Sequence, residues 1–234
     1  MARTVSSLLL AFGFLAFFTC VAEAQTRRSM FGTSRVSLAT LGPVQESLGL
    51  SDEQKALADE LHDELTRNRR QLFQEGGGDF DAMRQKIEEL DTAATSKFTE
   101  KLDDEQKRRL TEIFVQANGA NSLADPTVIE VLEITDEQQA KLEAARADNR
   151  ADFFDAFQDF QGMGDQERRD TMTRLRDDAD GRLLAILTDK QRTDFENLSG
   201  EKVDYNLDEL RGNFRGGGAG RRGGGESSRP QRPE

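Results

Sequence analysis

The side chains of this sequence that could do chemistry are mainly carboxylates, because its 234 residues include one histidine and one cysteine. Two groups could be metal ligands: His62 with Asp59, Asp63 or Glu64, and the carboxylates Asp177, Asp178 and Asp180. Soft divalent metals prefer imidazole or thiolate, so a single histidine makes a poor site for them. Carboxylates could hold calcium weakly, but no loop has the Asp-x-Asp-x-Asp-Gly order. We therefore expect no metal and no other cofactor, and we expect His62 to face solvent on a helix.

Catalytic signatures are missing from the sequence as well. One histidine allows few pairings of a nucleophile with a base, and there is no Ser-His-Asp set and no Gly-rich phosphate loop. Acidic pairs are frequent, but on amphipathic helices they usually form a solvated face. The sequence therefore favours a protein that is not an enzyme.

Export is predicted by residues 1–24. Arg3 supplies positive charge, the stretch from Leu8 to Val21 is apolar, and residues 22–24 have the small-x-small pattern of a cleavage site. A lipid attached at Cys20 and an uncleaved membrane anchor are the less favoured alternatives. Cleavage would remove the only cysteine, so packing alone would stabilise the mature chain. We expect a periplasmic or secreted protein without a transmembrane anchor.

The charge is distributed unevenly along the chain. The formal net charge is −12, while residues 212–234 carry five arginines against two glutamates, a net charge of +3, which leaves −15 for the rest. A strongly acidic body argues against nucleic acid as a partner. Residues 212–234 are dominated by Gly, Arg, Ser and Pro, with too few apolar groups to offset the entropy of ordering. They are predicted to form a disordered tail.

A five-residue pattern occurs four times and predicts four helix starts. Each copy has an aliphatic residue, then Ser, Thr or Asp, and a Gln three positions after that polar residue. In such a capping box the polar side chain accepts from the third helical N–H, and Gln reaches back to the cap's own N–H. We assign these residues structural roles. They are Leu50, Ser51 and Gln54; Leu102, Asp103 and Gln106; Ile134, Thr135 and Gln138; and Leu187, Thr188 and Gln191.

Apolar residues at helical spacing place a long helical hairpin between the first two copies and another between the last two. The turns of these hairpins lie at residues 76–78 and 162–164, and each hairpin is followed by a shorter helix. The copies are 52 residues apart in the first half and 53 in the second, which indicates an internal duplication. The sequence thus predicts an all-α fold of two duplicated hairpins, each with its trailing helix, packed as a pseudo-dimer.

The predicted domain boundaries follow from this pattern. Residues 25–42 lack helical periodicity and are predicted to be an exposed N-terminal segment. The first helical unit covers residues 43–125, the second covers residues 126–203, and the tail covers residues 212–234.

The helix after the third copy has an aromatic face, which carries Phe153, Phe154, Phe157 and Phe160. Another face of this helix carries Asp148, Asp152, Asp155 and Asp159. The corresponding helix of the first half is basic at Arg67, Arg69 and Arg70, so the two helices could pair across a pseudo-twofold axis.

The aromatic face has two interpretations. Its helical spacing favours an ordinary core. Alternatively it could bind unfolded clients weakly, with Met83 and Met163 as adaptable neighbours. We favour the core and keep Phe153, Phe154, Phe157 and Phe160 as the candidate client-binding surface.

The four motifs, the signal and the hairpins together resemble the LTxxQ family of exported Spy/CpxP-like proteins. Leu187, Thr188 and Gln191 match the pattern Leu-Thr-x-x-Gln outright. Ile134 replaces its Leu, while Ser51 and Asp103 replace its Thr, and each change keeps the capping chemistry. The resemblance covers residues 43 to about 200.

This resemblance implies an all-α protein of the bacterial periplasm. Family subunits carry two motifs and join as cradle-shaped dimers, so this four-motif chain is expected to be a monomeric pseudo-dimer rather than a homodimer. The implied function is chaperone-like, ATP-independent binding of unfolded or envelope proteins, or a role as an envelope-stress accessory. A metal-responsive sensor of the zinc, nickel or cobalt type is one alternative, and a structural protein with one fixed partner is another.

Overall fold

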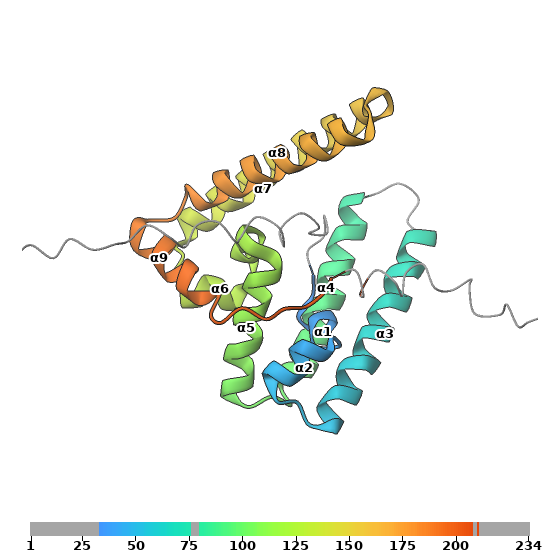
Figure 1. The fold of residues 1–234 in the computed structure, drawn as a ribbon, viewed down its shortest axis with the longest axis vertical. Helices are drawn as coiled ribbons and strands as arrows, with labels where there is room; N and C mark the ends of the chain where they lie inside the picture. Colours follow the sequence, from blue (N-terminus) through green and yellow to red (C-terminus); the bar gives the residue numbers. More distant parts are fainter. Residues whose placement is uncertain (1–32, 76–79, 208–209, 211–234) are drawn as a thin grey trace, which may run out of the picture.

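The computed structural model describes residues 33–75, 80–207 and 210, and all regular elements in these ranges are helices, as predicted (Figure 1). The predicted signal, residues 1–24, and the predicted tail, residues 212–234, lie outside the described residues. In chain order the elements are α1 (Arg35–Leu38), α2 (Gly42–Leu48), α3 (Asp52–Glu75), α4 (Phe80–Thr99), α5 (Asp104–Asn118), the 3-10 helix η2 (Gly119–Ala124), α6 (Pro126–Val131), α7 (Asp136–Asp159), the 3-10 helix η3 (Phe160–Gly162), α8 (Asp165–Leu184) and α9 (Asp189–Leu198).

Two long hairpins, α3–α4 and α7–α8, dominate the molecule (Figure 1). In both, a helix of 24 residues is followed by one of 20 residues, about 36 and 30 Å long at 1.5 Å per residue. Hairpin α7–α8 crosses the top of the view in Figure 1, while α3–α4 stands beside α5. The halves meet mainly through α5, η2 and α9, so the predicted pseudo-dimer packing of the hairpins stays a prediction. None of the helices described here is long and apolar enough to cross a membrane.

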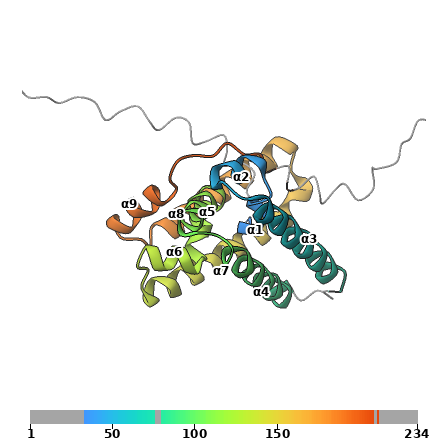
Figure 2. The same cartoon turned by 90° about the horizontal axis from the view of Figure 1, so that it is seen from below.

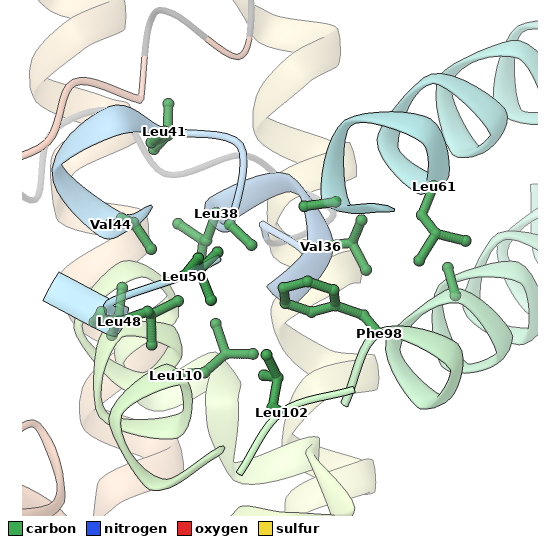
Figure 3. Packing of buried hydrophobic residues seen from close by; sticks show 14 of the residues in the cluster. Val36, Leu38, Leu41, Val44, Leu48, Leu50, Leu61, Phe98, Leu102 and Leu110 are labelled. Atoms are coloured by element: carbon green, nitrogen blue, oxygen red, sulfur yellow. The ribbon is translucent and has the colours of Figure 1, made fainter. Parts of the chain in front are cut away.

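The prediction of an exposed segment at residues 25–42 is wrong for its described part. Residues 34–39 are buried, and Val36 and Leu38 are completely covered. They lie on α1, which packs between α3, α4 and α5 (Figure 2). Figure 3 shows Val36 and Leu38 beside Phe98 and Leu110 in the first hydrophobic cluster. A helix of four residues is too short to display a 3.6-residue period, so periodicity could not reveal it.

The polar groups of this segment have specific partners. The Thr33 N–H donates to the Asn118 side-chain oxygen at 2.7 Å, and the Asn118 amide donates back to the Thr33 carbonyl at 3.0 Å. Arg35 forms a bidentate ion pair with Asp125 and lies over the Phe114 ring, 4.0 Å from its centroid. These contacts remove the cost of burying polar groups and tie α1 to the connection between the two halves.

The second hairpin closes around η2 as the first closes around α1. The triplet Ser37-Leu38-Ala39, at the end of α1 and its C-cap, recurs 85 residues later as Ser122-Leu123-Ala124 of η2. Leu123 is fully buried in the second hydrophobic cluster, with Leu142 of α7 and Leu183 of α8. A pair of helices leaves one side of its apolar stripe uncovered, and the short helix fills that side.

The chain after α9 returns to the first half. Gln116 of α5 donates to the carbonyls of Ser199 and Glu201 at 2.5 and 2.7 Å, and its oxygen accepts from the Val203 N–H at 3.1 Å. Beyond these bonds, Val203, Tyr205, Leu207 and Leu210 pack against the first hydrophobic cluster. The two halves are therefore interlocked, because the first cluster includes residues that follow α9 and the second cluster includes Val115, Ala120 and Leu123 from the first half.

Candidate functional site

All four capping boxes are present. In the first, Gln54 N–H donates to Ser51 Oγ at 3.2 Å and Ser51 N–H donates to Gln54 Oε1 at 2.9 Å. The boxes of Asp103, Thr135 and Thr188 have the same two bonds at the starts of α5, α7 and α9. Each box satisfies two backbone donors that a helix start would otherwise leave free.

The four glutamines also pair with one another, which sequence reasoning missed. Gln54 Nε2 donates to Gln106 Oε1 at 2.9 Å, and Gln106 Nε2 donates back to Gln54 Oε1 at 3.1 Å. Gln138 and Gln191 repeat this exchange at 2.7 and 3.0 Å. Each pair joins the start of a hairpin to the helix that follows the hairpin, and the nearly equal motif spacing of 52 and 53 residues was the available signal.

The remaining amide hydrogens of these glutamines are donated to backbone carbonyls. Gln54 donates to Lys101 O at 2.7 Å and Gln138 donates to Ile186 O at 3.1 Å, both at the end of the hairpin. Gln106 and Gln191 donate to the carbonyls of Leu48 and Leu132, at 3.3 and 3.2 Å. Every side-chain nitrogen and oxygen of the four glutamines therefore has a hydrogen-bond partner within the fold. The motif residues have structural roles.

The aromatic patch, defined as Phe153, Phe154, Phe157 and Phe160, is not core, and the interpretation we favoured is wrong. Phe154 and Phe157 are 65% and 68% exposed, and the other two rings are half-buried. Phe157 and Phe160 meet edge to face with centroids 5.8 Å apart. At about 100° per residue, Phe153 and Phe160 turn toward α8 while Phe154 and Phe157 turn away from it.

The exposure of the patch follows from its position far out on the second hairpin. Between residues 150 and 182, no side chain whose burial the structure describes is buried, whereas the matching part of the first hairpin buries Leu65, Met83 and Ile87. Met83 is buried on α4 of the first hairpin, while Met163 is half-buried just after η3. Within the part of the chain that the structure describes, the outer part of α7–α8 is therefore a two-helix arm without a third layer.

A polar network braces this arm at its base. Arg182 of α8 donates to Asp152 at 2.6 Å and to the Asn149 oxygen at 3.1 Å, and Asn149 donates to the Ala179 carbonyl at 3.3 Å. The Asp152 carboxylate raises the pKa of Arg182. Hydrogen bonds to buried Asn149 fix the rotation of α7 against α8, so the patch is held in one orientation.

The suggested pairing of the basic helix with the acidic one is not what the structure shows. Arg69 pairs with Asp91 of α4, 2.9 Å away, inside its own hairpin. Burial raises the pKa of Asp91, and the nearby Arg69 partly opposes that effect. On α7, Asp148, Asp155 and Asp159 remain exposed, and no ion pair of the described residues includes them.

His62 is half-buried rather than solvent-facing. Its Nδ1 lies 3.0 Å from the Ser37 hydroxyl of α1. Burial lowers the pKa of His62, although Asp63 and Asp59 act in the opposite direction. Over the described residues, no group of three or more His, Cys, Asp or Glu side chains is arranged to hold a metal ion. The acids Asp177 and Asp178 are exposed on α8, and Asp180 is half-buried there.

Comparisons with models of protein families, with curated proteins and with solved structures found no match for this chain. Its candidate site is therefore defined by its own geometry. That geometry is a braced helical arm presenting two exposed phenyl rings next to free carboxylates.

Proposed function

We propose that this protein is a non-enzymatic binding protein of the bacterial envelope that holds unfolded or partner proteins on the aromatic patch without ATP. The exposure of Phe154 and Phe157 carries the proposal. Neighbouring aromatic rings this accessible on a helix are costly unless they meet a partner. The predicted signal sequence and the resemblance to the LTxxQ family support the envelope location and the chaperone-like role.

The size of the patch suits weak and reversible binding. An aromatic side chain buries about 150–250 Å² when fully covered, so the exposed parts of two rings offer roughly 6 kcal/mol at about 25 cal/mol per Å². Association costs at least about 4 kcal/mol before any contact counts. The small surplus favours transient holding of many apolar segments, and the acidic body keeps such complexes soluble.

The test is suppression of the aggregation of a chemically denatured client at near-stoichiometric ratio. We expect the chain to protect the client, and the double variant Phe154→Ser/Phe157→Ser to lose most of that protection. Val131→Ser is the matched control, because Val131 is an exposed apolar residue of α6, 54% accessible, and is not part of the patch. Absence of protection by the unmodified chain at large molar excess would sink the chaperone proposal.

A protein with one fixed partner is the second candidate, and the bracing of the arm by Asn149, Asp152 and Arg182 favours it. A rigid surface suits one complementary partner better than many different ones. Pull-down from envelope extract separates the two: recovery of a single stoichiometric partner, lost in the Phe154→Ser/Phe157→Ser chain, favours the fixed partner. Recovery of many clients favours the chaperone.

A further inference from the structure

No element of the described residues covers the outer face of α7, and this uncovered surface begins before the aromatic patch. Exposed residues follow one another at intervals of three and four along this face: Ala140, Ala144, Ala147, Ala151 and Phe154. Phe157, also exposed, follows one turn later. The small side chains let another backbone approach closely, and the two rings close the face at its outer end.

This face is bordered by negative charge. Asp148, Asp155 and Asp159 are exposed along one side of it, and none of them is in an ion pair of the described residues. Residues 148–159 carry four aspartates and one arginine, a net charge of −3. A ligand of this face should therefore be cationic, thin enough to follow alanine side chains, and able to cover aromatic rings.

The chain contains a segment of that chemistry. Residues 212–234 carry five arginines, two glutamates and eight glycines, a net charge of +3. Glycine brings the backbone close to a surface because it has no Cβ. Guanidinium groups bind carboxylates in a bidentate manner and stack on aromatic rings. Arg35 already makes both contacts at once, with Asp125 and the Phe114 ring.

We propose that residues 212–234 dock on the outer face of α7, with their arginines on Asp148, Asp155 and Asp159 and against the rings of Phe154 and Phe157. The segment then covers the rings until a competing ligand displaces it. Tail docking can be measured without any client, so it stands or falls independently of the chaperone proposal.

The connection is long enough for this docking. Leu210, the last described residue, packs against the first hydrophobic cluster. The 24 residues from 211 to 234 can span up to about 80 Å when extended. Helix α7 is about 36 Å long, so the tail can cross the molecule and still follow the helix.

The first hairpin provides a matched surface that should not bind the tail. Phe73 of α3 lies 84 residues before Phe157 and is 49% exposed. Residues 67–75 of α3 carry three arginines and one glutamate, a net charge of +2, so a basic segment is repelled there. We therefore expect the tail to cover Phe157 but not Phe73, although the two residues have similar positions in their hairpins.

Tryptophan fluorescence can report the docking, because the natural chain has no tryptophan. The full chain with Phe157→Trp is compared with the same chain in which Arg215, Arg221, Arg222, Arg229 and Arg232 are replaced by serine. We expect blue-shifted emission only where the arginines are present, and we expect the difference to vanish near 1 M salt, where the Debye length is about 3 Å. With Phe73→Trp as the reporter, the arginine replacements should leave the emission unchanged.

Three outcomes would overturn the proposal. The first is identical emission of the two Phe157→Trp chains at low salt, with unchanged circular dichroism. The second is a blue shift that survives the arginine replacements and grows with protein concentration, which would make a second copy the occupant. The third concerns a peptide of residues 212–234 added to the full chain: equal affinity with and without the tail arginines would exclude a tethered competitor, which should weaken peptide binding by about tenfold or more.

Discussion

At the scale of single residues, the glutamine of each motif is required because its amide both donates and accepts. Gln191 is buried, gives one hydrogen to Gln138 Oε1 and the other to the Leu132 and Glu133 carbonyls, and accepts from the Thr188 N–H. Glutamate has nearly the same shape but no donor at neutral pH. The motif thus selects an amide for a reason that a helix cap alone does not give.

We predict that Gln191→Glu lowers the free energy of unfolding by about 2–4 kcal/mol, because it leaves two carbonyls and the Gln138 oxygen facing a carboxylate. Urea denaturation followed by circular dichroism measures the loss. Gln158→Glu on the exposed side of α7 is the control and should change stability by less than about 0.5 kcal/mol. A Gln191→Glu chain as stable as the unmodified protein would show that the pair is dispensable.

His62 should make stability depend on pH. Its pKa in the folded state is lowered from 6.5 by burial, while the unfolded chain keeps the ordinary value. Between these two values the unfolded state binds more protons, so the stabilisation is complete above the unfolded pKa and is lost as pH falls through the folded pKa. We expect urea midpoints to fall more steeply below about pH 6.5 in the unmodified chain than in His62→Gln. Parallel pH profiles of the two chains would contradict this.

At the scale of elements, the connections after α2 and α6 have the same backbone conformation but use different residues for it. The ends of α2 and α6 are each followed by a left-handed residue, Gly49 with φ 59° and Glu133 with φ 51°. In both, the following N–H bonds back five residues, Leu50 to Gln45 O and Ile134 to Ile129 O. Glycine adopts this conformation freely, but a residue with a Cβ is strained in it.

We therefore predict that Glu133→Gly raises the free energy of unfolding by about 1 kcal/mol and that Gly49→Ala lowers it by a similar amount. Glu133 is exposed, so little else is lost with its side chain. Thermal denaturation of the two variants and the unmodified chain gives opposite shifts in Tm if this holds. A lower Tm for Glu133→Gly would mean that the Glu133 carboxylate, rather than the backbone, decides stability there.

At the scale of the whole molecule, Gln116 ties the chain that follows α9 to the first half. Its side chain makes the three hydrogen bonds that return residues 199–203 to α5. Gly200 lies in this segment with φ 57°, and a Cβ there would come within 2.3 Å of Glu112 Oε2. A side chain at this position would therefore be strained by the positive φ and would displace the Glu112 carboxylate from its ion pairs with Arg108 and Arg109.

Replacement of Gln116 by Ala should release this segment without unfolding the hairpins. The variant loses hydrogen bonds worth about 1–3 kcal/mol. Because this lowers the free energy of local opening, we expect amide exchange at Val203 and its neighbours to accelerate by one to two orders of magnitude. Exchange in α3 and α4 should stay unchanged, which serves as the internal control. Uniform acceleration across the chain would instead show that residues 199–207 are part of the global folding unit.

The sequence by itself determined what is local. Ser51, Asp103, Thr135 and Thr188 start helices because a cap and its glutamine act within four residues, and periodicity then gives two long hairpins with trailing helices. The all-α fold followed from these signals. Pairing of the glutamines was within reach, since the motif spacing is nearly equal in the two halves, but a spacing does not say which atoms meet.

Only the tertiary structure decided which apolar faces are covered. Val36 and Leu38 were predicted to be exposed and are buried, whereas Phe154 and Phe157 were favoured as core and are exposed. A hairpin buries an apolar face only where a third element lies on it, and α1 and η2 cover the inner parts of their hairpins. Which face is covered depends on contacts between segments far apart in the chain, and helical periodicity carries no information about such contacts.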